Sequence, residues 1–121
     1  MRTVLVCGGR DFADRALVFR VLDAMRAGKG LDRLVHGGAA GADRLAAEWA
    51  LDRGVEQVAY QPDWKGLGRA AGPTRNQKML VEERPAVVVA FPGGAGTRDM
   101  CRRARQAKVV VLSVKSASGE R

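Results

Sequence analysis

The sequence is poor in the residues that build metal sites and disulfide frameworks. It holds one histidine, His36, and two cysteines, Cys7 and Cys101, in a chain of 121 residues. Neither cysteine belongs to a CxxC pair or a Cys/His cluster, which argues against a structural zinc site. Isolated cysteines of this kind are typical of small buried side chains in a reducing compartment. We therefore expect no metal, and the sequence identifies no certain cofactor, although a nucleotide-derived ligand is possible.

Long apolar runs are also missing. No stretch approaches the roughly 20 apolar residues that a membrane-spanning helix needs. The run Val4-Leu5-Val6 follows Arg2 but is too short for the core of a signal peptide. The sequence thus predicts a cytoplasmic protein. Its length suits one domain with one core, which we place at 1–114, followed by a disordered polar tail at 115–121.

Aromatic residues make up only 5% of the chain, whereas basic residues exceed acidic ones to give a formal charge of +8. The charge favours anionic partners such as nucleotides, nucleic acid or acidic protein surfaces, although it equally suits a merely soluble surface. Arg98, Arg102 and Arg105 share one face of a predicted helix, either as a solvated row or as a nucleic-acid track. The scarcity of aromatics for base stacking favours the solvated row.

Short β-branched runs alternate with helical patterns along the whole chain, which indicates a parallel sheet covered on both faces. The predicted fold is a Rossmann-like three-layer α/β/α sandwich with strand order 3-2-1-4-5 and two helices on each face. The third strand is less apolar than the others, so we expect it at an edge. The expected strands are Thr3–Cys7, Arg33–His36, Gln57–Gln61, Val87–Phe91 and Val109–Val114, and the expected helices are Asp14–Ala27, Ala42–Arg53, Pro73–Glu83 and Thr97–Ala107.

Three glycine-rich turns follow the strands that lie centrally in this order. In open parallel sheets, ligands bind where the winding reverses, beyond the carboxyl ends of the strands. Glycines there let a phosphate approach backbone N–H groups, and the following helix directs its positive end at the same place. The turns lack both the P-loop and the full GxGxxG patterns, which disfavours ATP hydrolysis and dinucleotide redox chemistry. The predicted ligand-binding residues in these turns are Gly8, Gly9, Gly37, Gly38, Pro92, Gly93, Gly94, Gly96 and Thr97.

Charged residues near these turns have two interpretations each. Arg10 and Asp11 either contact the phosphate and a hydroxyl or base of the ligand, or pair with each other. Arg75 opens a helix, where a cation opposes the helix dipole and an anionic ligand would explain it. Asn76 can bind ligand or loop backbone. Asp43 near a helix start is more simply a helix-end stabiliser than a ribose contact or general base.

The connection from Pro62 to Gly72 is longer than the ~2–6 residues usual in such folds, which suggests a functional lid. Within it, Trp64 either stacks on a base or is buried under the loop. His36 at a strand end is more simply a structural hydrogen-bonding residue than a site residue. Trp49 lies on an apolar helical stripe and is expected in the core. Thr97 either caps its helix or also contacts the phosphate.

Five ordered motifs resemble those of a known family. They cover about residues 3–114 and resemble the YspA-like branch of the SLOG superfamily, whose domains are Rossmann-like. The superfamily includes the LOG-type phosphoribohydrolases and the single-stranded-DNA binder DprA. The resemblance implies a nucleotide-derived ligand, a dimer, and a role in bacterial or phage conflict systems. The motifs are GGRDF at 8–12, VHGGAAGAD at 35–43, PDW at 62–64, GRAAGPTRNQKML at 68–80 and AFPGGAGTRDM at 90–100.

The resemblance assigns PGGAGT at 92–97 to the phosphate turn and Arg75-Asn76 to an arginine-containing helix start. The LOG-type pattern places a catalytic glutamate three residues after the threonine, and this chain has Met100 there. Any catalytic carboxylate must then be Asp11, Asp43 or Asp99. The sequence thus favours binding of a nucleotide or nucleotide-derived signal. The alternatives are an N-glycosidase of nucleoside monophosphates and a DprA-like single-strand binder.

Overall fold

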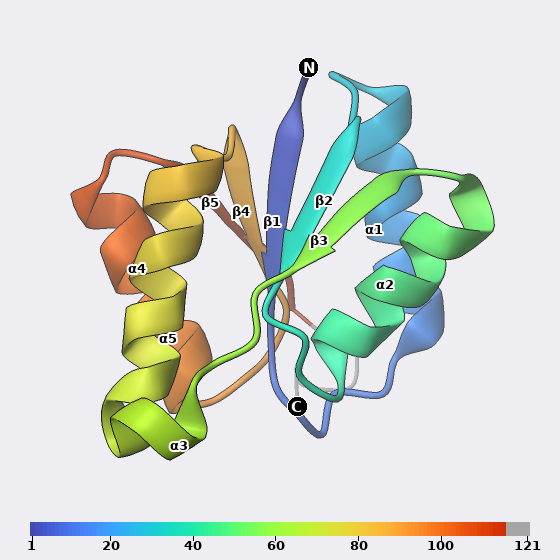
Figure 1. The fold of residues 1–121 in the computed structure, drawn as a ribbon. Coiled ribbons are helices and arrows are strands. Elements are labelled where there is room, and N and C mark those ends of the chain that lie inside the picture. Colours follow the sequence, from blue (N-terminus) through green and yellow to red (C-terminus); the bar gives the residue numbers. More distant parts are fainter. Residues whose placement is uncertain (116–121) are drawn as a thin grey trace.

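The computed structural model describes residues 1–115, so most of the predicted polar tail lies outside it. Strands and helices alternate along the chain, with the sheet between two helical layers (Figure 1). No helix in this described part is both long and apolar enough to cross a bilayer. The elements are β1 (Thr3–Cys7), α1 (Arg15–Ala27), β2 (Arg33–His36), α2 (Ala42–Arg53), β3 (Glu56–Ala59), α3 (Trp64–Leu67), the 3-10 turn η1 (Gly68–Ala70), α4 (Ala71–Glu83), β4 (Val87–Ala90), α5 (Ala95–Gln106) and β5 (Val110–Ser113).

The sheet is parallel throughout, with strand order β3-β2-β1-β4-β5. In register, Leu5 of β1 lies between Val35 of β2 and Val88 of β4. The predicted Rossmann-like topology is confirmed, including the edge position of β3. The reversal of winding between β1 and β4 places the turns that follow these two strands side by side.

Two apolar layers hold the sheet, because alternate side chains of a strand point to opposite faces. Val4 and Val6 of β1 pack with α1 and α2, and Trp49 is fully buried in this layer as expected. Leu5 faces the opposite layer, which α4 and α5 cover. Both faces of β1 are therefore apolar, which explains why its sequence is a continuous hydrophobic run.

Several helix ends match their sequence signals. Asp14 caps α1 by accepting a hydrogen bond from the N–H of Leu17 at 3.1 Å, and Gly54 ends α2 in the left-handed conformation. The prediction for the last helix was wrong by two residues, since α5 begins at Ala95 rather than Thr97. Its N-cap is Gly94, so Thr97 is not a cap. Glycine lowers helix propensity, which is why the start was placed too late.

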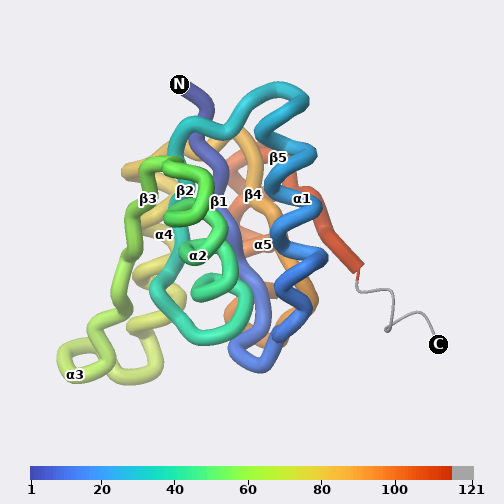
Figure 2. The backbone as a smooth tube through the Cα atoms, turned by 90° about the vertical axis from the view of Figure 1, so that its right-hand side faces the viewer, coloured from blue at the N-terminus to red at the C-terminus, as the bar shows by residue number. Residues whose placement is uncertain are grey.

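The prediction of a long loop at 62–72 was also wrong, because most of this stretch is helical. α3 and η1 follow one another directly, and α4 begins at Ala71, two residues before Pro73. The carboxylate of Asp63 starts α3 by accepting a hydrogen bond from the N–H of Gly66 at 2.9 Å. α3 protrudes at the end of the molecule where the strands finish (Figure 2).

Candidate functional site

The turn after β1 lies between the other two glycine turns and bonds to both. The N–H of Gly9 donates to the carbonyl of Pro92 at 2.8 Å, and the N–H of Ala42 donates to the carbonyl of Gly9 at 3.1 Å. These contacts join segments that are more than 30 residues apart in the chain. The three turns therefore form one structure at the carboxyl ends of β1, β2 and β4.

Glycine is needed where these turns touch. A Cβ on Gly41, whose φ is +78°, would lie 2.1 Å from the carbonyl oxygen of Gly9. A Cβ on Gly93 would lie 2.6 Å from the Gly9 nitrogen and 2.3 Å from Oγ1 of Thr97. In contrast, nothing lies within 4 Å of a Cβ built on Gly94 or Gly96. The first two glycines thus serve packing, whereas the last two leave open space.

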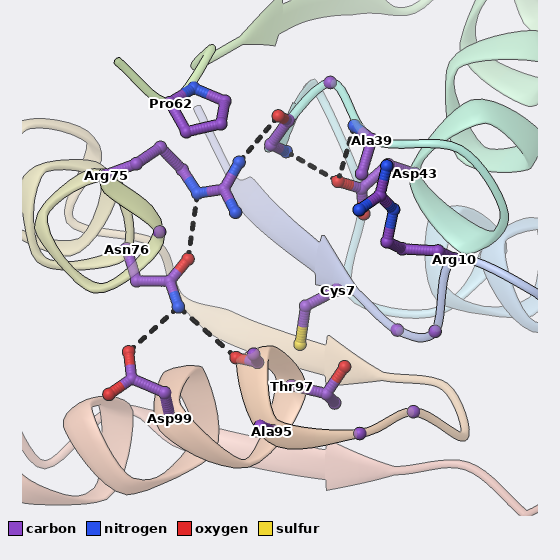
Figure 3. Close-up of a pocket in the computed structure, with 18 of the residues that line it drawn as sticks. Cys7, Arg10, Ala39, Asp43, Pro62, Arg75, Asn76, Ala95, Thr97 and Asp99 are labelled. Carbon is purple, nitrogen blue, oxygen red and sulfur yellow. Dashed lines mark hydrogen bonds between the residues drawn. The ribbon is translucent and has the colours of Figure 1, made fainter. Parts of the chain in front are cut away.

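The turns and the start of α4 enclose an open cavity of about 1220 Å³ (Figure 3). Every ligand-binding residue proposed from the sequence lines it, together with Asp99. This placement brings the predicted residues together but does not by itself show a ligand contact. The lining residues from that prediction are Gly8, Gly9, Arg10, Asp11, Gly37, Gly38, Asp43, Trp64, Arg75, Asn76, Pro92, Gly93, Gly94, Gly96 and Thr97.

Helix α5 reaches the cavity with an open N-terminus. Its N-cap, Gly94, supplies no side-chain hydrogen bond, and its first turn holds no acidic residue. The first N–H groups of an α-helix have no partner within the helix, and the helix dipole adds partial positive charge there. Thr97 sits in this first turn with its hydroxyl against Gly93. The arrangement suits an anion.

Helix α2 also begins at a glycine, Gly41, without a side-chain cap, but it carries its own anion. Oδ2 of the buried Asp43 accepts hydrogen bonds from the N–H groups of Gly37 at 3.0 Å and Ala39 at 3.2 Å. Asp43 thus holds the turn that precedes α2, whereas the expected helix-end role has no hydrogen bond to the helix N–H groups behind it and stays a prediction based on its place in the first turn. Burial raises the pKa of this carboxyl, although hydrogen bonding to Ala39 and the charge of Arg75 act in the opposite direction.

The second oxygen of Asp43 faces the cavity. Oδ1 accepts no hydrogen bond from the described residues. In that part of the chain every buried side-chain oxygen or nitrogen has a hydrogen-bond partner, so an oxygen without one is not buried. Oδ1 must then be open to the cavity that Asp43 lines. A carboxylate oxygen in this position accepts a hydrogen bond from a hydroxyl or an amino group.

Arg75 ties α4 to the turn after β2. Its Nη1 donates to the carbonyls of Gly37 at 2.7 Å and Tyr60 at 3.3 Å, and its Nε donates to Oδ1 of Asn76 at 3.0 Å. Burial lowers the pKa of Arg75, and the charge of Asp43 raises it, while a guanidinium keeps its proton in proteins. Only Nη2 remains without a partner among the described residues, so this arginine is largely structural.

Asn76 is buried and uses both ends of its amide within the protein. Its Nδ2 donates to Oδ2 of Asp99 at 3.0 Å and to the carbonyl of Gly96 at 3.3 Å (Figure 3). Asp99 is also paired with Arg102 and Arg103 on α5. Burial raises the pKa of Asp99, but hydrogen bonds from Asn76 and Arg103 outweigh it and lower the pKa. This network fixes the start of α5 against α4.

Arg10 and Asp11 line the cavity and are exposed to solvent. Within residues 1–115 they form no ion pair with each other, so the pairing interpretation is not observed. Arg44 and Arg69 also line the cavity without a salt-bridge partner in the described chain, and our sequence analysis missed both. Arg44 directly follows Asp43 in the first turn of α2, where a cation opposes the helix dipole. The argument applied to Arg75 would have found it.

The remaining candidates divide between structure and surface. His36 is buried, its Nε2 lies 2.9 Å from Oε1 of Gln57, and its Nδ1 accepts from the N–H of Gly38 at 3.1 Å. It is thus a structural hydrogen-bonding residue. Trp64 is 58% exposed at the cavity rim, so burial under the loop was the wrong interpretation. Met100, at the position of the LOG-type glutamate, is fully buried in the layer between α5 and the sheet.

The cavity offers no ready nucleophile or metal site. The side chain of Cys101 and burial raise the pKa of Cys7, so its thiol stays protonated although it lines the cavity. Within the described part of the chain, no three His, Cys, Asp or Glu side chains gather as metal ligands. The chemistry of the site is therefore that of backbone N–H groups, guanidinium groups and two carboxylates with free oxygens, Asp11 and Asp43.

Comparisons with known proteins identify the family and the fold of the chain. Gene 61 protein of Mycobacterium phage D29 is 38% identical over 122 residues, covering 93% of this chain and 96% of the phage protein. The X-ray structure of DNA processing protein A (DprA) from Streptococcus pneumoniae superposes with a TM-score of 0.77 at 20% identity. It covers 99% of this chain, which spans about half (52%) of that protein. The family model for YspA, cpYpsA-related SLOG proteins matches residues 2–66. The family model covers about half of the chain, and the phage relative matches most of it. Together they show that the protein belongs to the YspA, cpYpsA-related SLOG family.

Proposed function

We propose that this domain binds a nucleotide or a nucleotide-derived signal and holds its phosphate at the start of α5. The observation that carries the proposal is the open N-terminus of α5 in the cavity wall. Gly94 gives no side-chain cap, the first turn holds no acidic residue, and a Cβ there would meet nothing. Phosphate oxygens would accept hydrogen bonds from the free N–H groups and be stabilised by the helix dipole.

The charges around the cavity support an anionic ligand. Arg10, Arg44 and Arg69 have no salt-bridge partner among residues 1–115, and Nη2 of Arg75 is free as well. Arg10 and Arg75 would neutralise the phosphate, and Thr97 would add a hydroxyl donor. Asp43 would accept a hydrogen bond from the sugar, and the exposed Asp11 from the sugar or base. Asn76 would position α5 rather than touch the ligand, because its amide is already engaged.

The proposal is tested by calorimetry with inorganic phosphate, ribose 5-phosphate and the four common nucleoside 5′-monophosphates. Gly94→Asp would place a carboxylate where the phosphate belongs and weaken binding about 100-fold without steric conflict. Gly94→Ala adds a methyl group to the same open space and serves as the matched control, with affinity retained within a few-fold. No binding across the whole panel by the parent protein would refute the proposal.

A hydrolase is the second candidate, and Asp43 is the observation in its favour. Of the three carboxylates considered, Asp99 is held by two arginines and Asp11 is exposed, whereas Asp43 combines burial with a free oxygen in the cavity. The reaction would be hydrolysis of the N-glycosidic bond of a nucleoside monophosphate by water. Release of free base, lost in Asp43→Asn with nucleotide binding retained, distinguishes this activity from binding alone.

Binding of single-stranded nucleic acid is the third candidate. Its only support is the fold that this chain shares with DprA. Affinity for oligonucleotides that falls steeply with salt, without competition by mononucleotides, would identify it. The track of Arg98, Arg102 and Arg105, the dimer and the cytoplasmic location stay predictions. A role in bacterial or phage conflict also stays a prediction, with which the mycobacteriophage relative is compatible.

A further inference from the structure

We propose that Trp64 is a stacking platform for the planar base of the ligand, so that the site takes a nucleoside phosphate rather than a bare sugar phosphate. This inference rests on the proposed phosphate site and adds a second subsite to it. Trp64 lies on the rim of the same cavity that α5 enters, and 58% of its surface is exposed. Large aromatic side chains usually bury most of their area, which makes an open tryptophan beside a binding cavity informative.

The segment around Trp64 is built to present this side chain rather than to cover it. Asp63 accepts a hydrogen bond from the N–H of Gly66, and the N–H of Leu67 donates to the carbonyl of Asp63 at 2.9 Å. A Cβ on Gly66 would lie 2.4 Å from Oδ2 of Asp63, so glycine lets the carboxylate close this turn. Local hydrogen bonds therefore hold the backbone that carries the ring.

The ring lies beside the start of α4. Its Cη2 atom is 3.8 Å from the position that a Cβ on Gly72 would occupy, so the ring edge meets no side chain of residue 72 there. Gly72 and Pro73 line the cavity beside it, and Arg69 lies on the same short segment. More than half of the Trp64 surface is therefore exposed at the cavity, and Arg69 adds to the same lining a cation that suits a phosphorylated ligand.

The second tryptophan of the chain shows the contrasting case. Trp49 is fully buried between α2 and the sheet, and its Nε1 donates to Oδ1 of Asp23 at 2.8 Å. The ring N–H of Trp64 donates no equivalent hydrogen bond to any of the described residues. Because the chain holds only two tryptophans, solvent-accessible indole fluorescence reports on Trp64 alone.

The matching occupant is the base of a phosphorylated nucleoside. Every nucleobase offers a flat π-face, and stacking on an aromatic side chain contributes about 1–3 kcal/mol per base by alanine substitution, roughly five- to 150-fold in affinity. The base can belong to a free mononucleotide or to a nucleotide within a single strand. The experiment therefore compares nucleoside monophosphates with a short single-stranded oligonucleotide on the same variants.

The test combines calorimetry with acrylamide quenching of tryptophan fluorescence in the full chain. We expect nucleoside 5′-monophosphates to shield Trp64 from acrylamide and ribose 5-phosphate not to. Trp64→Ala should weaken the nucleotides about tenfold and leave ribose 5-phosphate and inorganic phosphate within twofold. Trp64→Phe, which keeps a flat ring, should lose less than Trp64→Ala. If the oligonucleotide alone responds to these variants, the base belongs to a strand.

The matched control is Leu67→Ala, because Leu67 lies on the same short helix, is 45% exposed and is not among the described residues lining the cavity. It should leave every affinity unchanged. The inference is overturned if Trp64→Ala binds both the nucleoside monophosphates and the oligonucleotide as the parent does, or if ribose 5-phosphate binds as tightly as either. In those cases loss of binding by Gly94→Asp would still support the phosphate site. A protein that binds no member of the panel refutes both.

Discussion

Helices α1 and α5 begin in opposite ways. The N-terminus of α1 is closed by the carboxylate of Asp14, which accepts from the N–H of Leu17. The N-terminus of α5 starts at Gly94, has no side-chain cap, and lies in the cavity wall. A side chain satisfies the free N–H groups where the helix end only supports the fold. Where the end faces the cavity, those groups are left for a ligand.

Ion pairing of the arginines follows this division only in part, since Arg102 lines the cavity but pairs with Asp99, and Arg20 on α1 has no salt-bridge partner among residues 1–115. Away from the cavity, Arg33 pairs with Glu83 at 2.8 Å and Arg53 pairs with Asp23 at 2.8 Å. At the cavity, Arg10, Arg44 and Arg69 have no such partner in the described chain. Exposed ion pairs contribute little to stability, typically about 0–1 kcal/mol each. Leaving these arginines unpaired therefore costs the fold little and provides positive charge for binding.

Gly41→Ala should have the largest effect on stability, because it would push apart the turns after β1 and β2 that form the cavity. A Cβ there would lie 2.1 Å from the Gly9 carbonyl oxygen, at a φ of +78° that disfavours alanine. We expect a loss of about 3 kcal/mol or more in the free energy of unfolding. Urea denaturation measures it. The control is Gly54→Ala, which has a similar φ of +68° but open space around the Cβ, and stability equal in both variants would contradict the packing argument.

Gly94→Asp should convert the end of α5 into a closed end like that of α1. We expect phosphate affinity to fall about 100-fold, since charge-assisted hydrogen bonds are lost and like charges meet. The free energy of unfolding should rise by a few tenths of a kcal/mol, because aspartate caps helices slightly better than glycine. Calorimetry and urea denaturation measure the two effects. A variant that keeps full phosphate affinity would contradict the location of the site.

Asp14→Ala is the reciprocal change, and it opens the closed end of α1. We expect a loss of about 1 kcal/mol of stability, the usual value for an N-cap. Phosphate affinity should stay within twofold of the parent value, because Asp14 is not one of the residues that line the cavity. Thermal denaturation and calorimetry on the same sample separate the two readouts. An affinity that falls together with stability would mean that the helix ends are not functionally distinct.

Arg10→Gln should reduce nucleotide affinity about three- to tenfold at low salt, with little effect on stability, because Arg10 is exposed and unpaired within residues 1–115. The difference from the parent protein should shrink as salt increases, since screening weakens contacts between exposed charges. Calorimetry at two salt concentrations measures it. Arg20→Gln, an exposed arginine on α1, is the control and should bind as the parent does. Equal loss in both variants would indicate a non-specific charge effect.

The smallest expected effect is on the stability of the protein at acid pH, to which the hydrogen-bond network of Asn76 and Asp99 at the start of α5 contributes. The pKa of Asp99 is lowered in the folded protein below its ordinary value of 3.8. Its contribution is therefore fully present above that value and is lost as the pH falls through the lowered folded pKa. Asp99→Asn should flatten the acid decline of the melting temperature, and Asp11→Asn serves as the exposed control. An identical decline in parent and Asp99→Asn would contradict this role.

The sequence alone was sufficient for the topology. β-branched runs such as Val87-Val88-Val89 are apolar on both faces, which only a covered parallel sheet explains. Right-handed connections then leave few strand orders, and the reversal between β1 and β4 predicts where the turns meet. The composition of those turns was enough to name their own residues in the cavity lining, because glycine there serves backbone approach rather than side-chain packing, but it did not reveal Arg44 or Arg69.

Only the tertiary structure decided which polar groups are free and which are already used. Arg75 and Asn76 look alike as ligand residues in sequence, but their hydrogen bonds go largely to backbone and to Asp99, segments that are distant in the chain. The same holds for Asp43, one oxygen of which is engaged, and for Trp64, which Asp63 and Gly66 hold at the surface in a segment that reads as a loop. Sequence patterns report periodicity and local propensity, whereas the satisfaction of a hydrogen bond or the exposure of a ring depends on partners that only folding brings near.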